Sequence, residues 1–259
     1  MSLNKKSYPT TIGDLIYQLN ITDELLQSFI NNRQEYNRFY MPKKLGGIRL
    51  IAIPSYRLAK VQKYIKLKFL DHYEVDKAAA AYRYGKSIVD NAKIHSKSKV
   101  IIRIDLKDFF QSITFVQVLD LFNSLGFENK ISSILASLCT DAESIGSDNR
   151  NANNSGNLPQ GACTSPVLSN LISKNLDIRL RSLADKLSFN YTRYSDDLIF
   201  SSKTFSDSCD EIIASIETIV NSEGFEINQK KTKIMRQHNR QIVNGLIVNN
   251  GVAMSRKDF

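Results

Sequence analysis

The chain has 259 residues, 42% of them hydrophobic and 24% charged, a composition typical of a globular protein with a sizeable core. Its three cysteines lie far apart without a Cys-x-x-Cys pair, which fits neither a disulfide framework nor a zinc site. The N-terminus lacks a signal-like apolar core and no stretch reaches the length of a membrane span, so we expect a cytoplasmic protein without membrane contact.

The net charge of +9 is concentrated in the first part of the chain. Residues 1–99 hold 18 basic and 8 acidic side chains, a net charge of +10, whereas the remainder is close to neutral. A polyanion such as nucleic acid is the natural partner for such a surface. A solvated basic face that serves solubility is the alternative on charge alone.

Helical and hairpin patterns fill this basic part. Apolar residues recur at helical spacing, and Thr22 suits the N-cap of the second helix because acidic residues follow in its first turn. The segment 35–54 alternates strand-like runs around a Gly-Gly pair and predicts a hairpin. The expected helices span 11–19, 22–31 and 57–71, the last with lysines between its apolar positions.

The rest of the chain alternates strands with longer helices. A strand at 99–104 leads into Asp105, and strand-like runs at 191–194 and 198–202 flank an Asp-Asp pair. A polar loop of turn-forming residues is expected at 148–156. Further helices are expected at 114–125, 129–139, 164–187 and 206–222, and closing strands at 231–236 and 241–249. This order predicts an α+β fold with helices packed on one side of an antiparallel sheet.

Three aspartates carry the clearest chemical signal. Asp196 and Asp197 stand side by side at the bend of the expected hairpin, where folding would favour Asn-Gly or Asp-Gly. A solvated turn is the alternative for that pair taken alone. Asp105 ends another strand, so three carboxylates would meet at neighbouring strand ends. Neither motif contains His or Cys, and hard oxygen ligands suit Mg²⁺, so we expect two magnesium ions here, with Mn²⁺ as a substitute.

Five motifs resemble those of reverse transcriptases and follow that family's order over about residues 40–250. They are KKLGGIRLIAIP, RIDLKDFFQSI, LPQG, YSDD and GFEINQKKTKIM. NAKIH at 91–95 and VNGLIVN at 243–249 are similar to elements of the bacterial retron-type branch, although Asn244 stands where threonine is usual. Group II intron enzymes and other defence-associated bacterial reverse transcriptases share much of this pattern, so the branch stays open on sequence.

The resemblance implies a two-metal active site. Asp105, Asp196 and Asp197 would hold the metal ions, with the carbonyl of Leu106 as a further ligand. Lys231 would protonate the leaving pyrophosphate, and a solvated face is its alternative. Two neighbouring lysines compete for the same role, Lys230 and Lys233.

The resemblance also implies substrate contacts. Phe110 would face the incoming sugar and exclude a 2′-hydroxyl by its bulk; core packing is the alternative, and Phe109 is expected in the core. Gln160 would contact the nucleotide, and Gly161 would let the backbone approach the template pair. Two cations of the fingers hairpin would neutralise the triphosphate, Lys43 and Arg49, with a surface position as the alternative for Lys43.

The implied fold is a right-hand polymerase of the α+β class, with an antiparallel palm sheet backed by helices. The fingers would comprise residues 1–99 and a helical insertion at about 115–187, and the palm would occupy the remainder of residues 100–259. A complete thumb is not expected within this sequence. Three alternatives stay open: the sequence stops short of the thumb, a partner chain supplies the thumb function, or the protein works without one.

The implied activity is RNA-directed DNA polymerisation, the extension of a primer with deoxynucleoside triphosphates on an RNA template. The expected setting is a retron or a related bacterial antiviral defence system, with a structured noncoding RNA and an effector protein as partners. A noncatalytic nucleic-acid-binding scaffold is one alternative, against which the intact aspartates argue. A nucleotide cyclase is another, against which LPQG and the basic fingers argue.

Overall fold

The computed structural model describes residues 8–31, 35–42, 47–142, 156–204 and 208–254. The chain forms two compact units, the first from residues 1–73 and 110–172 and the second from residues 74–109 and 173–259. The sequence assigned residues 74–99 to the fingers, whereas they join the second unit. Naming the units as fingers and palm stays a prediction.

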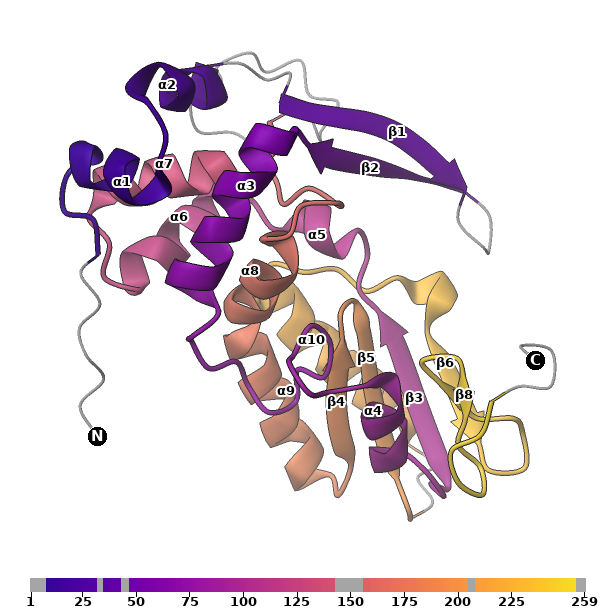
Figure 1. Ribbon diagram of the computed structural model, residues 1–259. Helices are drawn as coiled ribbons and strands as arrows, with labels where there is room; N and C mark the ends of the chain where they lie inside the picture. Colours follow the sequence, from indigo (N-terminus) through magenta and orange to yellow (C-terminus); the bar gives the residue numbers. More distant parts are fainter. Residues whose placement is uncertain (1–7, 32–34, 43–46, 143–155, 205–207, 255–259) are drawn as a thin grey trace. The chain divides into compact units, whose positions relative to one another are not determined.

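Short amphipathic helices build the first unit. They are α1 (Ile12–Leu19), α2 (Asp23–Asn31), α3 (Tyr56–Ile65), α5 (Phe109–Ser112), α6 (Phe115–Ser124), α7 (Asn129–Cys139) and α8 (Ser165–Ile172), with a π-helical turn, η2 (Lys66–Leu70), continuing α3 (Figure 1). The expected N-cap Thr22 accepts a hydrogen bond from the Leu25 amide (3.3 Å). Phe69, Phe122 and Phe127 meet edge to face in the core. No helix in the described part of the chain is long and apolar enough to cross a membrane.

An antiparallel hairpin is tied to these helices at its base. Strands β1 (Tyr36–Pro42) and β2 (Ile48–Pro54) pair in register from Tyr36 opposite Pro54 to Pro42 opposite Ile48. The buried Gln62 of α3 donates hydrogen bonds to the Tyr36 hydroxyl (2.8 Å) and to the Leu138 carbonyl (2.9 Å). The far end of the hairpin is exposed on both strands. The expected turn around the Gly-Gly pair lies mostly outside the described residues.

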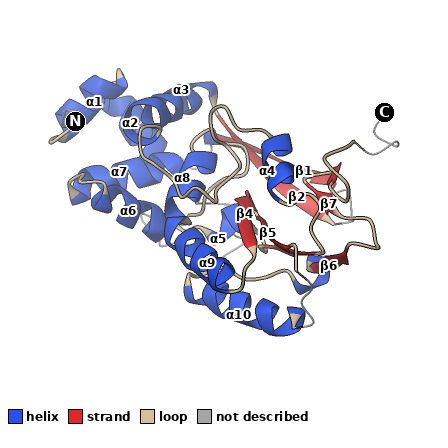
Figure 2. Ribbon diagram, turned by 90° about the horizontal axis from the view of Figure 1, so that it is seen from below, coloured by secondary structure: helices blue, strands red, loops and turns tan. Residues whose placement is uncertain are grey.

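The second unit is built on a four-stranded antiparallel sheet in the order β4-β5-β3-β6. Its strands are β3 (Val100–Asp105), β4 (Asn190–Tyr194), β5 (Asp197–Ser202) and β6 (Lys233–Arg236). Helices α9 (Lys174–Lys186) and α10 (Cys209–Ser222) cover one face of this sheet (Figure 2). The α+β class, with an antiparallel sheet backed by helices, is therefore confirmed.

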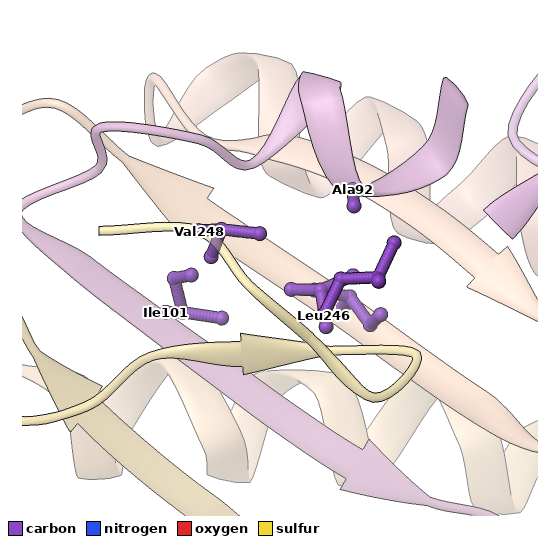
Figure 3. Packing of buried hydrophobic residues seen from close by; sticks show 6 residues of the cluster. Ala92, Ile101, Leu246 and Val248 are labelled. Carbon is purple, nitrogen blue, oxygen red and sulfur yellow. The ribbon is translucent and has the colours of Figure 1, made fainter. Parts of the chain in front are cut away.

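The opposite face of the sheet carries α4 (Ile88–Ile94) and a small hairpin of β7 (Ile242–Val243) and β8 (Leu246–Ile247) (Figures 2 and 3). One buried cluster joins these elements to the sheet: Ala92, Ile101, Ile199, Val243, Leu246 and Val248. The sequence predicted helices on one side only. α4 adds a helix on the second face because Ala92 and its neighbours complete a core above β3 and β5.

One expected helix is divided into two. The sequence predicted a continuous helix over 164–187, but α8 ends at Ile172 and α9 begins at Lys174. Ser173 between them is fully buried and has a ψ of 6°, which interrupts the helical hydrogen-bond ladder. No Gly or Pro follows Pro166 in this segment, so nothing local marks the break.

One expected strand is a hairpin instead. The sequence predicted a strand over 241–249, but Asn244 and Gly245 both have positive φ angles, 49° and 83°, between β7 and β8. Asn-Gly is the preferred pair for such a two-residue turn, because both residues tolerate the left-handed region. The expected polar loop at 148–156 lies, up to residue 155, outside the described residues.

Candidate active site

The three aspartates of the second unit gather at one end of its sheet. Asp105, the last residue of β3, lies opposite Asp197, the first residue of β5. Asp196 precedes it in the two-residue turn between β4 and β5, and its carbonyl accepts a hydrogen bond from the Leu106 amide (2.8 Å). The register of two neighbouring strands therefore brings the predicted carboxylates together.

Two cations form ion pairs with two of the three carboxylates. Lys231, at the end of the 3₁₀-helical turn η3 (Gln229–Lys231), contacts both oxygens of Asp105 through Nζ, at 2.9 and 3.1 Å. Arg103 forms a bidentate ion pair with Asp197, with Nη2 at 2.7 Å from Oδ2 and Nε at 3.0 Å from Oδ1. The predicted Lys231 thus lies at the aspartates, while its competitors Lys230 and Lys233 are exposed.

Arg103 is a site residue that the sequence reasoning missed. A signal for it was present, because residues two apart on a strand share a face, and Arg103 precedes Asp105 by two. Its guanidinium matches the carboxylate of Asp197 in a fork geometry that a lysine could not reproduce.

Burial and mutual repulsion perturb the carboxyl groups. The pKa of Asp196 is raised to about 6, first by burial and then by the charges of Asp197 and Asp105. Burial also raises the pKa of Asp197, and the neighbouring guanidinium of Arg103 opposes that shift. The cluster therefore concentrates negative charge that costs folding free energy and that a bound cation would stabilise.

The donor set suits a hard divalent cation, because it consists of carboxylate oxygens and peptide carbonyls. In the described part of the chain no group of three His, Cys, Asp or Glu side chains is arranged to hold a metal ion. Lys231 and Arg103 engage two of the three carboxylates instead. Metal binding by these aspartates would require Lys231 and Arg103 to give up some of their hydrogen bonds to Asp105 and Asp197.

The predicted substrate residues belong to the first unit. Phe110 is 9% exposed, which is compatible both with a contact to the sugar and with core packing. Phe109 is 3% exposed and packs on Phe225, with 5.6 Å between ring centres, as expected of a core residue. Arg49 is exposed on β2 opposite Met41. Lys43 lies outside the described residues.

The LPQG segment packs against the hairpin of the same unit. The Gln160 carbonyl accepts a hydrogen bond from the Ala52 amide (3.0 Å). Gly161 has a φ of 145°, and a Cβ at this position would lie 2.6 Å from the Ala52 carbonyl oxygen. This close approach to β2 explains the glycine within the fold, while its predicted approach to a template pair stays a prediction.

Comparisons with known proteins agree with the motifs. Residues 41–246 match the family described as reverse transcriptase (RNA-dependent DNA polymerase). The retron Mx65 reverse transcriptase of Myxococcus xanthus is 34% identical over 235 residues, covering 87% of this chain and 54% of that protein. The retron Ec86 reverse transcriptase of Escherichia coli is 32% identical over 243 residues, covering 92% of this chain and 71% of that protein.

Solved structures show the same fold at low sequence identity. A telomerase from Candida albicans, solved with a telomeric RNA fragment, has a TM-score of 0.52 at 12% identity, covering 90% of this chain and 49% of that one. Telomerase from Candida tropicalis has a TM-score of 0.53 at 13% identity, covering 85% and 55%. The chain spans about half the length of the Myxococcus relatives that it matches.

Proposed function

This chain belongs to the reverse transcriptase family, and from that premise we propose that it is an RNA-directed DNA polymerase of a retron. It extends a primer with deoxynucleoside triphosphates on an RNA template. The observation that carries the proposal is the pairing of Asp105 with Asp197 across β3 and β5, with Asp196 in the adjoining turn. Repulsion from Asp197 and Asp105 helps to raise the pKa of Asp196, a cost that a bound cation would relieve.

In the proposed mechanism Asp105, Asp196 and Asp197, with the Leu106 carbonyl, would hold two Mg²⁺ ions. When bound there, the ions would supply Lewis-acid activation of the primer hydroxyl and charge neutralisation of the leaving pyrophosphate. Lys231 would orient Asp105 through its two contacts, and its ammonium would offer a proton at Nζ to the pyrophosphate. Arg103 orients Asp197 in the same way.

We assign the substrate contacts by the family motifs. Phe110 lies against the sugar and excludes a 2′-hydroxyl, Gln160 contacts the nucleotide, and Gly161 brings the backbone to the template pair. The triphosphate meets the cations of the hairpin, Lys43 and Arg49. In this assignment the first unit provides the fingers and the second provides the palm.

The retron setting rests on the two elements NAKIH and VNGLIVN. Both are similar to the retron branch, and Asn91 of the first forms a hydrogen bond with Asn244 of the second. A structured noncoding RNA is the template and primer source in this proposal, and an effector protein in an antiviral defence system is the further partner. The basic side chains of α3 provide a surface for the RNA backbone.

Primer extension tests the proposal. The chain is incubated with an RNA template and annealed DNA primer, with deoxy- or ribonucleotides, and with Mg²⁺, Mn²⁺ or Ca²⁺. We expect deoxynucleotide addition with Mg²⁺ or Mn²⁺ and none from Asp196→Asn or Asp105→Asn. Asp120→Asn, which changes an exposed acid of α6, is the matched control and should retain full activity.

A melting experiment tests the metal site without activity. Mg²⁺ should raise the Tm of the wild-type chain, because a ligand that binds only the folded state stabilises it, and should raise that of Asp196→Asn less. Synthesis by Asp196→Asn would overturn the catalytic assignment. RNA binding without synthesis by the wild type would favour the noncatalytic scaffold.

A further inference from the structure

A fully buried ion pair is hydrogen-bonded to the turn between β4 and β5, which consists of Ser195 and Asp196. Arg193 of β4 and Asp177 of α9 both have 0% exposed side chains, and two hydrogen bonds join them, Nη2 to Oδ2 at 2.7 Å and Nε to Oδ1 at 2.9 Å. The Tyr191 hydroxyl donates to the same carboxylate (2.9 Å). The guanidinium also lies over the ring of Phe109, 5.6 Å from its centre.

The third guanidinium nitrogen of Arg193, Nη1, contacts the turn itself. Nη1 donates a hydrogen bond to the carbonyl of Ser195 (3.2 Å), the residue immediately before Asp196. The Tyr82 hydroxyl donates to the Ser195 hydroxyl (3.0 Å). Two backbone hydrogen bonds, from Arg193 to the Ala78 carbonyl and from Ala80 to the Arg193 carbonyl, both 2.8 Å, hold the strand from which the guanidinium extends.

Ser195 needs this support because its backbone is strained. Its φ is 60°, in the left-handed region that glycine usually occupies and that residues with a Cβ enter at a cost. Such a conformation persists where the surroundings impose it, and it is found disproportionately at functional sites. Glycine at this position would remove the strain but would give the turn more accessible backbone conformations.

Stability alone does not account for the ion pair. Replacing a buried pair with apolar residues is often neutral or stabilising, because the attraction between the charges only repays their desolvation. The pair instead fixes the orientation of the guanidinium. With Nε and Nη2 bound to Asp177, Nη1 is directed at the Ser195 carbonyl.

We propose that Arg193, held by Asp177, is a positioning residue that fixes the Ser195 carbonyl and so aims the carboxylates of Asp196 and Asp197. The role rests on the proposed polymerase function, in which those carboxylates act. Arg193 itself touches neither substrate nor metal. Its contribution is to keep both aspartates in the reactive arrangement while the primer and nucleotide bind.

The decisive variant removes both charges together, Asp177→Asn with Arg193→Met. No unpaired buried charge remains, the amide oxygen introduced at position 177 still accepts from Tyr191, and the Ser195 carbonyl loses its donor. The control is Asp76→Asn with Arg181→Met, the same changes in a second ion pair anchored on α9, with Arg181 Nη2 at 2.9 Å from Asp76 Oδ2. Among the described residues, no hydrogen bond joins that pair to Ser195.

Single-nucleotide addition gives the first readout. We expect the Asp177→Asn/Arg193→Met chain to lose about 100-fold in kcat with KM for the nucleotide nearly unchanged, since misplacing reacting groups by about 1 Å costs that much. The control chain should keep wild-type kcat. A wild-type kcat in the test chain would overturn the proposal, as would an equal loss in both chains.

Hydrogen exchange in the metal-free chain gives a readout independent of activity. The peptide covering Ser195 and the aspartates should exchange about fivefold faster or more in the test chain, with the rest of β4 and β5 unchanged. Unchanged exchange of the turn would also overturn the proposal. If the wild-type chain does not polymerise, the proposed function fails, and this measurement still decides whether Arg193 fixes the turn.

If the double variant does not fold, Ser195→Gly tests whether a fixed turn before Asp196 matters for catalysis. Glycine suits the φ of this position, so the Tm should be unchanged or higher, while the turn should exchange faster and kcat should fall. Full kcat together with a mobile turn would mean that fixing the turn does not matter, which would overturn the proposal.

Discussion

The Asn91 side-chain amide donates a 2.5 Å hydrogen bond to Asn244 Oδ1, a residue 153 positions later in the chain. Asn91 is buried on α4, and Asn244 is the first residue of the β7–β8 turn. The bond joins the two motifs that resemble retron enzymes. The chain neighbours Ala92 and Val243 belong to one buried cluster with Leu246, in which Ala92 and Leu246 are labelled in Figure 3. The two motifs therefore form one packed unit, in which α4 and the β7–β8 hairpin cover the same face of the sheet.

A double-mutant cycle should detect the hydrogen bond between Asn91 and Asn244. Asn91→Ala and Asn244→Gly, where glycine keeps the left-handed turn, should show a coupling free energy of about 1 kcal/mol in urea unfolding, the usual net contribution of a hydrogen bond. Asn91→Ala combined with Asn221→Ala, an exposed residue of α10, serves as the control and should be additive. Additivity in the first cycle as well would show that the bond contributes nothing.

His95 should make stability depend on pH. It is buried, with Nδ1 at 2.8 Å from the Ser201 hydroxyl and Nε2 at 2.7 Å from that of Thr192, and burial lowers its pKa from 6.5 to about 3. The unfolded chain binds a proton below pH 6.5 and the folded chain does not, so stability is full above that pH and falls as the pH drops toward 3.

Comparison with His95→Gln isolates this effect from other titrating groups. Between pH 7 and pH 5 the wild-type free energy of unfolding should fall by about 2 kcal/mol more than that of the variant. Urea unfolding at both pH values measures the difference. Parallel pH dependence in the two chains would contradict the low pKa of His95.

Gly161→Ala should destabilise the first unit. The new Cβ would lie 2.6 Å from the Ala52 carbonyl oxygen, and the φ of 145° is strained for alanine, so we expect a loss of about 2 kcal/mol or more. Gly126→Ala is the matched control, because Gly126 also has a positive φ, 95°, but nothing within 4 Å of its Cβ position. Equal losses in urea unfolding would mean that backbone strain, and not the contact with β2, explains Gly161.

Phe110→Val should weaken discrimination between deoxy- and ribonucleotides if Phe110 faces the sugar. A smaller side chain leaves room for a 2′-hydroxyl, so the ratio of kcat/KM values should fall by about tenfold or more. Phe109→Leu is the control: it trims a buried ring, so it should lower the Tm and leave the ratio unchanged. An unchanged ratio for Phe110→Val would assign Phe110 to the core.

Local patterns in the sequence determined most helices and strands and the place of the aspartates. Helix caps such as Thr22, and apolar runs on both sides of Asp196-Asp197, depend on neighbours a few residues away, so they can be read along the chain. The Asn-Gly turn at 244–245 was equally local and was missed. The motif order identified the family for the same reason, since each motif is a short contiguous segment.

Tertiary structure alone decided which side chains meet. No glycine or proline near Ser173 signals the break between α8 and α9, although Ser173 is the N-cap of α9. Asp177 and Arg193 each look like a surface charge in the sequence, and only the packing of α9 on β4 buries them together and directs the guanidinium to Ser195. Ion pairs of this kind depend on strand register and helix packing between distant segments, and these are set by the whole core.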